Sequence, residues 1–221
     1  MIFARQRPVV CLVTDRRRTA PGASSFAGQQ QALLALIAAA ADAGADLVHI
    51  REHDLSVRDL HRLAAAAVGI TRGSGCRIVV GDRADVAIAA GADGVHLPAA
   101  GPPVARVRAS VPRGWFVGRS AHSREELVLA GAADYAVFGT VFATDSKPGM
   151  PGQGIQGLAD AVAHSQTPIL AIGGITIERA RACAAAGASG VAAISLFIPG
   201  VPGGIGPRRA VDLLRRAFNA D

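Results

Sequence analysis

Apolar and polar positions follow one another along the chain in short blocks that predict strands separated by helices. In four blocks an Ala-rich segment is followed by a Gly and a short apolar run; the Gly residues are Gly44, Gly91, Gly131 and Gly187. A Gly directly after a helix commonly ends it in the left-handed conformation, and an unbroken apolar run is typical of a strand buried on both faces. The pattern therefore predicts a repeated unit of helix, glycine stop and buried strand.

Four further apolar runs lie between these units, at residues 8–14, 76–80, 115–120 and 168–175. The total of about eight strands alternating with helices favours parallel pairing through helical crossovers. Eight units in 221 residues fit a (β/α)8 TIM barrel near the short end of its size range. An open doubly wound sheet is the alternative, but it would carry a glycine fingerprint after its first strand, where this chain reads DRRRTAPG. We predict a single (β/α)8 barrel domain over residues 1–221.

Composition narrows the class of partner and the compartment. The formal net charge is +6, yet the arginines are scattered and aromatic residues make up only 4%. A nucleic-acid binder usually clusters both kinds of residue, so a phosphorylated small molecule is the better match. Cys11, Cys76 and Cys183 lack CxxC spacing, which indicates buried thiols in a reducing compartment. With no signal peptide and no bilayer-spanning apolar stretch visible, we expect a cytoplasmic protein without nucleic-acid or membrane partners.

Candidate functional residues follow from the barrel rule that active sites lie at the carboxyl ends of the strands and in the loops after them. Polar residues at the second to sixth predicted strand ends are Arg51, His53, Asp82, Ser120, His122, Thr144, Ser146 and Lys147. Because a histidine titrates near neutral pH, His122 is the candidate proton carrier. His96 falls within a predicted strand, and we expect it to be packed instead of catalytic.

The last two predicted strands end in residues suited to a phosphate. Gly173 and Gly174 follow the seventh strand, and Ser195 follows the eighth. Barrels commonly hold a phosphate between these two loops, against the amino terminus of a short helix. Adjacent glycines let backbone N–H groups approach phosphate oxygens closely, although a tight turn into the next helix is an alternative reason for them. With Ser195 nearby, we predict a phosphate site.

Seven segments, in chain order, resemble the thiamine phosphate synthase superfamily. They are IREHDLS, VVGDRADVA, GADGVHL, RSAHS, AADYAVFG, FATDSKPG and AIGGIT, and the resemblance runs from Thr14 to about Phe197. It implies a (β/α)8 barrel with one of two activities. The synthase branch joins a hydroxymethylpyrimidine diphosphate to a thiazole phosphate with Mg²⁺. The TenI-like branch is a thiazole tautomerase that acts on a carboxythiazole phosphate in thiamine biosynthesis.

Departures from the synthase pattern favour the tautomerase. Gly81 stands where the superfamily has an Asn before the metal-binding Asp82, and His53 stands where it has a Lys. Residues 98–101, Pro-Ala-Ala-Gly, replace the segment that carries the second metal carboxylate. Mg²⁺ prefers oxygen ligands, and a departing diphosphate needs its charge neutralised. The loss of these groups together predicts that the synthase reaction is disfavoured.

The tautomerase branch implies a site that works without metal or cofactor. His122 matches the catalytic histidine and would move a proton first as base and then as acid. Arg51 would meet the substrate carboxylate, and Thr144, Ser146 and Lys147 would fold over the bound thiazole phosphate. Mg²⁺ belongs only to the synthase alternative, and a non-catalytic regulator that binds thiazole phosphate is a second alternative. Small barrels often pair, which allows a homodimer.

Overall fold

Eight parallel strands close into a barrel in which each strand pairs with the next and β8 pairs with β1. The computed structural model describes residues 7–144, 149 and 151–219. The strands are β1 (Val9–Val13), β2 (Leu47–Ile50), β3 (Arg77–Gly81), β4 (Gly94–Leu97), β5 (Phe116–Ala121), β6 (Tyr135–Gly139), β7 (Ile169–Ile172) and β8 (Gly190–Ala193). The prediction of a (β/α)8 barrel is confirmed.

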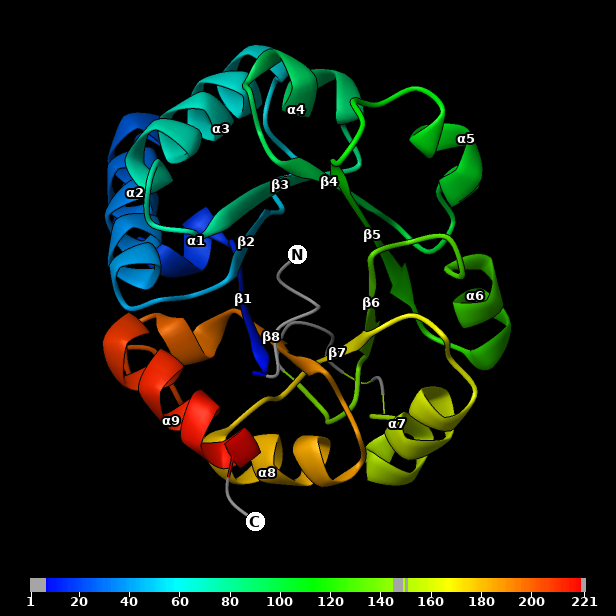
Figure 1. The fold of residues 1–221 in the computed structure, drawn as a ribbon. Coiled ribbons are helices and arrows are strands. Elements are labelled where there is room, and N and C mark those ends of the chain that lie inside the picture. The colour runs from blue at the N-terminus through cyan, green and yellow to red at the C-terminus, as the bar shows by residue number, and fades with distance from the viewer. Residues whose placement is uncertain (1–6, 145–148, 150, 220–221) are drawn as a thin grey trace.

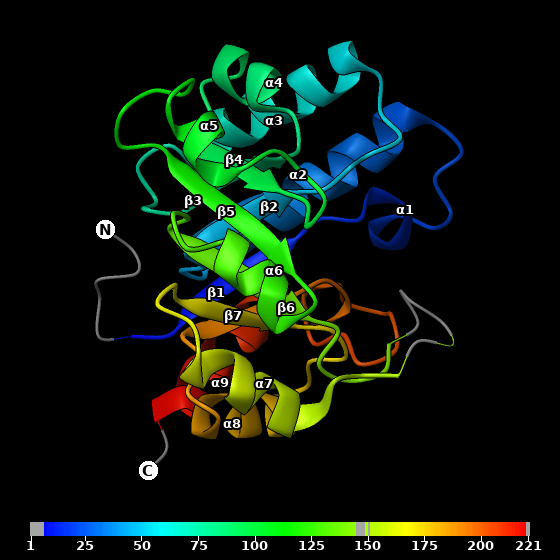
Figure 2. The same cartoon turned by 90° about the vertical axis from the view of Figure 1, so that its right-hand side faces the viewer.

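Helices surround the strands on all sides, as Figure 1 shows in the view along the barrel. They are α1 (Arg16–Thr19), α2 (Phe26–Asp42), α3 (Val57–Thr71), α4 (Ala84–Ala89), α5 (Val104–Arg108), α6 (Arg124–Leu129), α7 (Gly154–Ala163), α8 (Ile177–Ala185) and α9 (Pro207–Asn219), with a short 3₁₀ helix, η2 (Ser195–Phe197). In Figure 2 the arrowheads of β5 and β6 point to the right-hand side, where α1 lies. This side is the carboxyl-terminal mouth of the barrel.

The glycine stops work as predicted at three of the four junctions. Gly44, Gly91 and Gly187 follow α2, α4 and α8 with φ values of 87°, 70° and 85°, the left-handed conformation that glycine adopts without steric cost. The prediction is wrong for Gly131, whose φ is not positive. Gly131 stands two residues after the end of α6 at Leu129, the same spacing as at the other three junctions, but the hydrogen bonds that follow differ. Ala45, Ala92 and Ala188 each donate to a carbonyl five residues earlier, whereas after Gly131 the Ala133 N–H donates to the Ala130 carbonyl, three residues earlier.

The strand residues divide between two packed layers because successive side chains of a strand point to opposite faces. Val9, Cys11 and Val13 of β1 pack inside the barrel, whereas Val10 and Leu12 pack against the helices. All three cysteines are buried free thiols, as predicted. The central layer therefore fills the lower barrel with apolar side chains and leaves polar groups near the mouth.

Three further expectations concern membrane segments, domain number and assembly. Among the described helices, none is both long and apolar enough to pass through a bilayer. The assignment of residues 1–221 to one domain and the formation of a homodimer stay predictions.

A buried carboxylate ties the last helix to the first two strands. Asp46, 3% exposed, accepts hydrogen bonds from Arg7 at 2.7 Å, from Arg215 of α9 at 2.9 Å and from the Val10 backbone at 2.9 Å. Arg215 also donates to the backbone carbonyls of Pro8 and Gly44. The network thus connects α9 to the start of β1, near the place where β1 pairs with β8 and closes the barrel.

We expect Asp46→Ala to lower the free energy of unfolding by about 3–5 kcal/mol, because Arg215 would keep a partly buried charge without its partner. Urea denaturation followed by circular dichroism measures the change. Asp85→Ala is the matched control: Asp85 forms an ion pair with Arg83 in which the carboxylate is 65% exposed, so its loss should cost less than about 1 kcal/mol. Equal losses in the two variants would contradict the role given to Asp46.

Candidate active site

A cavity of about 340 Å³ opens at the carboxyl-terminal mouth of the barrel, within the size range of small-molecule sites. It is lined by residues from most of the strands and from the loops after them. Seven residues selected from the sequence lie around it: Arg51, Ser120, His122, Thr144, Gly173, Gly174 and Ser195. Residues spread over 145 positions of the chain therefore meet in one place, as the barrel rule requires.

The other four selected residues are His53, Asp82, Ser146 and Lys147. His53 and Asp82 are exposed, on the loops after β2 and β3, and do not line the cavity. Ser146 and Lys147 fall outside the described residues. Partial burial, followed by the positive charge of Arg51, lowers the pKa of His53. His53 is therefore a weaker cation than the Lys that the superfamily pattern has at this position.

The glycine pair after β7 has a conformation and a setting that exclude side chains. Gly173 and Gly174 have φ values of 102° and 60°. A Cβ on Gly173 would lie 2.5 Å from the Thr140 side chain, and one on Gly174 would lie 2.6 Å from the Ala143 carbonyl oxygen. Both glycines are thus required by backbone conformation and by space, and their bare backbone faces the cavity.

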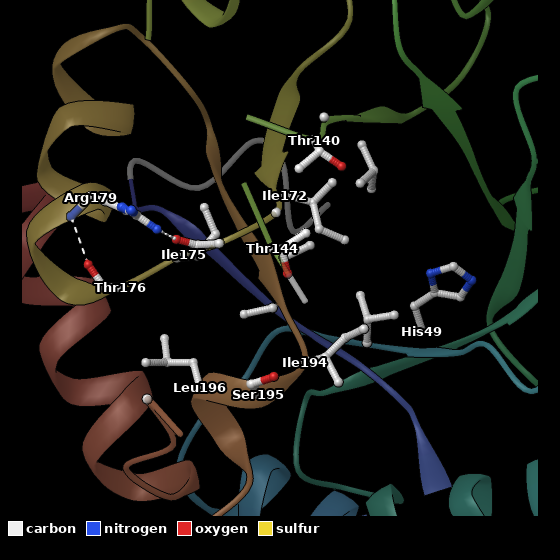
Figure 3. A pocket seen from close by; sticks show the side chains of 18 of the residues that line it. His49, Thr140, Thr144, Ile172, Ile175, Thr176, Arg179, Ile194, Ser195 and Leu196 are labelled. Carbon is white, nitrogen blue, oxygen red and sulfur yellow. Dashed lines mark hydrogen bonds between the residues drawn. The ribbon is translucent and has the colours of Figure 1, made fainter. Parts of the chain in front are cut away.

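Two arginines that the sequence analysis did not select support this end of the cavity. Arg179 of α8 donates to the Gly174 carbonyl at 2.7 Å and stacks over the Phe142 ring at 4.8 Å. In Figure 3, Arg179 and Thr176 lie on one side of the pocket and His49 lies on the other. Arg18 of α1 donates to the Ser195 hydroxyl at 3.2 Å. Arg18 follows the end of the first strand, so the barrel rule would have found it if applied to that strand too.

A buried ion network fixes the segment that carries Arg51. Arg16, 7% exposed, donates to Glu52 at 2.9 Å and to both carboxylate oxygens of Asp54 at 2.5 and 2.6 Å. These bonds lower the pKa of Asp54 to about 2. The Arg51 backbone N–H donates to the hydroxyl of fully buried Thr14 at 3.0 Å. The loops after β1 and β2 are therefore joined at Arg51 and directly after it.

The floor of the cavity is polar but uncharged. His49 and His96 lie side by side, with ring centroids 4.3 Å apart, and both line the cavity. Burial lowers the pKa of His96 to about 3 and also lowers that of His49 well below its usual value. His96 is packed, as expected from its place within a strand, and it accepts no proton near neutral pH.

The His49 ring lies close to the position that a side chain at residue 81 would take. Its Nε2 atom is buried and has no hydrogen-bond partner among the described residues. A Cβ on Gly81 would lie 3.0 Å from this atom, so the imidazole takes the space that a side chain at residue 81 would use. Gly81 therefore compensates for the larger residue on the neighbouring strand.

His122 is held at the edge of the cavity by its neighbours. Its Nδ1–H donates to the Gly139 carbonyl, its backbone N–H donates to Glu126 at 2.6 Å, and Gln153 donates to its carbonyl at 2.5 Å. Ser123 caps α6, accepting from the Glu126 backbone N–H at 3.3 Å. The residue is in place to contact a ligand, with Nε2 as the ring nitrogen left for it.

The residues do not form a ready-made Mg²⁺ site. Over residues 7–144, 149 and 151–219, no three His, Cys, Asp or Glu side chains are grouped so as to hold a metal. Asp82 has a φ of 65°, uncommon for a residue other than glycine, but residues 98–101 bring no carboxylate near it. The buried Arg119 instead donates to the carbonyls of Ala99, Gly101 and Pro102. This donor set does not fit a two-carboxylate site.

The chain is similar to known proteins over most of its length. It is 44% identical over 174 residues to the thiamine-phosphate synthase of Methanoculleus marisnigri, which covers 77% of this chain and 82% of that protein. It is 37% identical over 191 residues to the thiamine-phosphate synthase of Chlorobium luteolum, covering 85% and 84%. The solved thiamine phosphate pyrophosphorylase of Pyrococcus furiosus matches with a TM-score of 0.78 and 29% identity, over 96% of this chain and 95% of that one.

These relatives show that the prediction of a tautomerase, and with it of an isomerase, is wrong. The similar proteins carry the name of the synthase, a transferase, which agrees with the predicted small-molecule class of ligand. Missing metal ligands were weak evidence against the synthase. Mg²⁺ keeps several waters and often binds through one or two carboxylates plus substrate phosphates, so a change in the protein ligands does not by itself exclude a diphosphate reaction.

The family assignment covers the whole barrel. The sequence model described as thiamine monophosphate synthase matches residues 10–197, a range that runs from β1 to η2 and includes every residue found around the cavity except the two from the segment after η2, Pro202 and Gly203. The chain belongs to the thiamine monophosphate synthase family.

Proposed function

We propose that the chain is a thiamine-phosphate synthase that joins a hydroxymethylpyrimidine diphosphate to a thiazole phosphate. In this reaction the thiazole ring nitrogen forms a bond to the pyrimidine methylene carbon while the bond from that carbon to the diphosphate breaks. The products are thiamine phosphate and diphosphate. The observation that carries the proposal is the cavity in which an anion niche and Arg51 lie above an uncharged polar floor, supported by relatives named for this activity.

The niche formed by Gly173, Gly174 and Ser195 is assigned to the phosphate of the thiazole substrate. Backbone N–H groups of adjacent left-handed residues form a concave anion site, and the Ser195 hydroxyl adds a donor or acceptor. Thr144 and Thr140 bring further hydroxyls to the same cavity. Arg18, 3.2 Å from the Ser195 hydroxyl, adds positive charge behind it. The thiazole phosphate would be held by its anionic end, with its ring directed over the floor.

Arg51 is assigned to the diphosphate of the second substrate. A guanidinium offers a planar fork of donors that matches phosphate oxygens in pairs, and it carries its charge at every working pH. The bond from its own backbone N–H to Thr14 and the bonds of Glu52 and Asp54 directly after it hold its segment in place before substrate binds. Such a fixed cation stabilises negative charge as the diphosphate leaves.

Mg²⁺ accompanies this reaction in the family resemblance, and Asp82 is the one residue of the chain that it assigns to the metal. When bound, the ion would neutralise charge on the diphosphate. Because the donor set does not fit a ready-made site, no step is assigned to the metal, and the chain's own cations and N–H groups carry the electrostatic stabilisation. The proton-carrier role given to His122 belonged to the tautomerase reaction; the proposal keeps this residue as a ligand contact at the edge of the cavity.

The first test is formation of product. Purified protein mixed with hydroxymethylpyrimidine diphosphate, thiazole phosphate and Mg²⁺ should form thiamine phosphate, measured by chromatography after oxidation to the fluorescent thiochrome. Arg51→Met should lower kcat/KM by about 10²- to 10³-fold, the usual cost of one electrostatic contact to a departing anion. Arg58→Met, on the exposed face of α3, is the control and should leave the rate unchanged. Product formation at the wild-type rate by the Arg51 variant would contradict the assignment.

A second test addresses the glycine niche. Gly174→Ala places a methyl group 2.6 Å from the Ala143 carbonyl oxygen and should weaken binding of thiazole phosphate by at least about tenfold, the value of a hydrogen bond to a charged group. Isothermal titration calorimetry measures the dissociation constant. Gly200→Ala is the matched control, since Gly200 has a φ of 82° and open space around it. If both variants bind equally well, backbone strain and not the niche accounts for the glycines.

A further inference from the structure

The turn after β7, residues 173–175, has its glycine carbonyls paired with hydrogen-bond donors. The Gly173 carbonyl accepts from the Phe142 N–H at 3.2 Å, and the Gly174 carbonyl accepts from the Arg179 guanidinium at 2.7 Å. Within the part of the chain that the structure describes, the N–H groups of Gly174 and Ile175 have no hydrogen-bond acceptor, and both residues line the cavity. A turn with paired acceptors and free donors is suited to an anion, because backbone groups in an enclosed site need partners.

The same turn is free to present the wrong group to an anion. The peptide that joins Gly174 to Ile175 is trans, so its C=O and its N–H point in opposite directions. Rotation about the backbone bonds on either side would exchange the two groups, and glycine permits both orientations because it has no Cβ. In the exchanged orientation the carbonyl oxygen would face a phosphate and repel it. A group that fixes this carbonyl therefore decides whether the niche presents a donor or an acceptor.

Arg179 is the group that fixes this carbonyl. It lies in the first turn of α8, where its backbone N–H donates to the Thr176 hydroxyl at 3.2 Å (Figure 3). Its guanidinium donates through Nη1 to the Gly174 carbonyl and lies over the Phe142 ring, 4.8 Å from the ring centroid. A planar guanidinium can stack on a ring and donate at its edge at the same time. The carbonyl is thus held toward α8, and the Ile175 N–H is turned the opposite way.

The same guanidinium joins the turn to the loop after β6. Phe142 belongs to that loop, which lies alongside the turn because its Val141 N–H donates to the Ile172 carbonyl at 2.8 Å. Thr140 and Thr144 of the same loop line the cavity. Stacking on Phe142 therefore connects the backbone donors of the turn to the loop that brings two threonines to the niche.

We infer that Arg179 is a positioning residue for the phosphate of the thiazole substrate: it holds the Gly174 carbonyl away from the niche, so that the Ile175 N–H faces the anion. This inference rests on the proposed function. Because Arg179 also lines the cavity, a direct charge contact with the phosphate is the competing role. The guanidinium already donates to the carbonyl and covers the Phe142 ring, which favours action through the turn.

Two probes, thiazole phosphate and the same thiazole without its phosphate, test the inference by calorimetry. Arg179→Met should weaken binding of thiazole phosphate by about three- to tenfold, the value of one hydrogen bond, and should leave binding of the unphosphorylated thiazole unchanged. In steady-state assays the KM for thiazole phosphate should rise, whereas kcat and the KM for the pyrimidine diphosphate should not change. Arg181→Met is the matched control, because it removes the same charge from another exposed residue of α8. It should bind both probes as wild type.

A crystal structure of Arg179→Met reads the peptide orientation directly. Its Gly174 carbonyl should lie in the niche or occupy both orientations, whereas in Arg181→Met it should keep the wild-type orientation. Weaker binding with an unchanged peptide would assign Arg179 to a direct charge contact, and wild-type binding by Arg179→Met would remove it from phosphate recognition. Either result would overturn the inference even where the wild type makes thiamine phosphate.

The wild type itself separates this inference from the proposed function. A wild type that neither binds thiazole phosphate nor forms product would overturn the proposed function, and the role of Arg179 with it.

Discussion

The space inside a closed barrel of eight strands is the constraint on which the site depends. Neighbouring strands approach so closely that a Cβ on Gly94, Gly139 or Gly190 would lie 2.0–2.2 Å from a backbone oxygen of the next strand. The interior volume is limited, so a large side chain fits inside only where a neighbouring residue is small. Beside Gly81 and Gly118 this exchange leaves room for polar rings: His49, which lines the cavity, and Tyr135, which is fully buried.

The cavity above this interior has two electrostatic regions. Arg18, Arg51 and Arg179 lie at or behind its rim, whereas the histidines of its floor stay neutral because they are buried. Heterocyclic phosphates have the same division, with an uncharged ring and an anionic end. The net charge of +6 thus reflects in part a local arrangement at the mouth instead of a basic surface for a polyanion.

Much of the architecture could be predicted because strands and helix ends have local sequence patterns. Buried parallel strands appear as apolar runs, and three glycine stops follow their helices as expected. The mouth residues were found because strand order alone brings strand ends together. Tyr135 was missed because it lies within an apolar run, where an aromatic residue reads as core; only the register of β4, β5 and β6 shows that it reaches His96. Arg119 was missed for the same reason.

The choice of branch was the larger failure, and its cause is physical. Three differences at the mouth counted against the synthase, but two of them have a local counterpart in the fold: Gly81 lies beside His49, and Arg119 binds the carbonyls of the loop that replaces the second carboxylate. A single sequence shows that a family residue has been replaced, but it does not show which residue lies beside it in the fold and compensates for the replacement. Identity spread over 174 to 191 residues averages over such exchanges and is the better guide to activity.

Gly118 carries no reactive atom, and no inspection of functional groups would select it. Even so, every larger residue at this position must displace either the Tyr135 phenol or the His96 imidazole, which meet across it. In saturation mutagenesis the position would tolerate nothing, and it would be classed with the residues that only keep the protein folded. Part of the information that shapes the barrel interior is therefore held by the absence of a side chain, which conventional maps of essential side chains overlook.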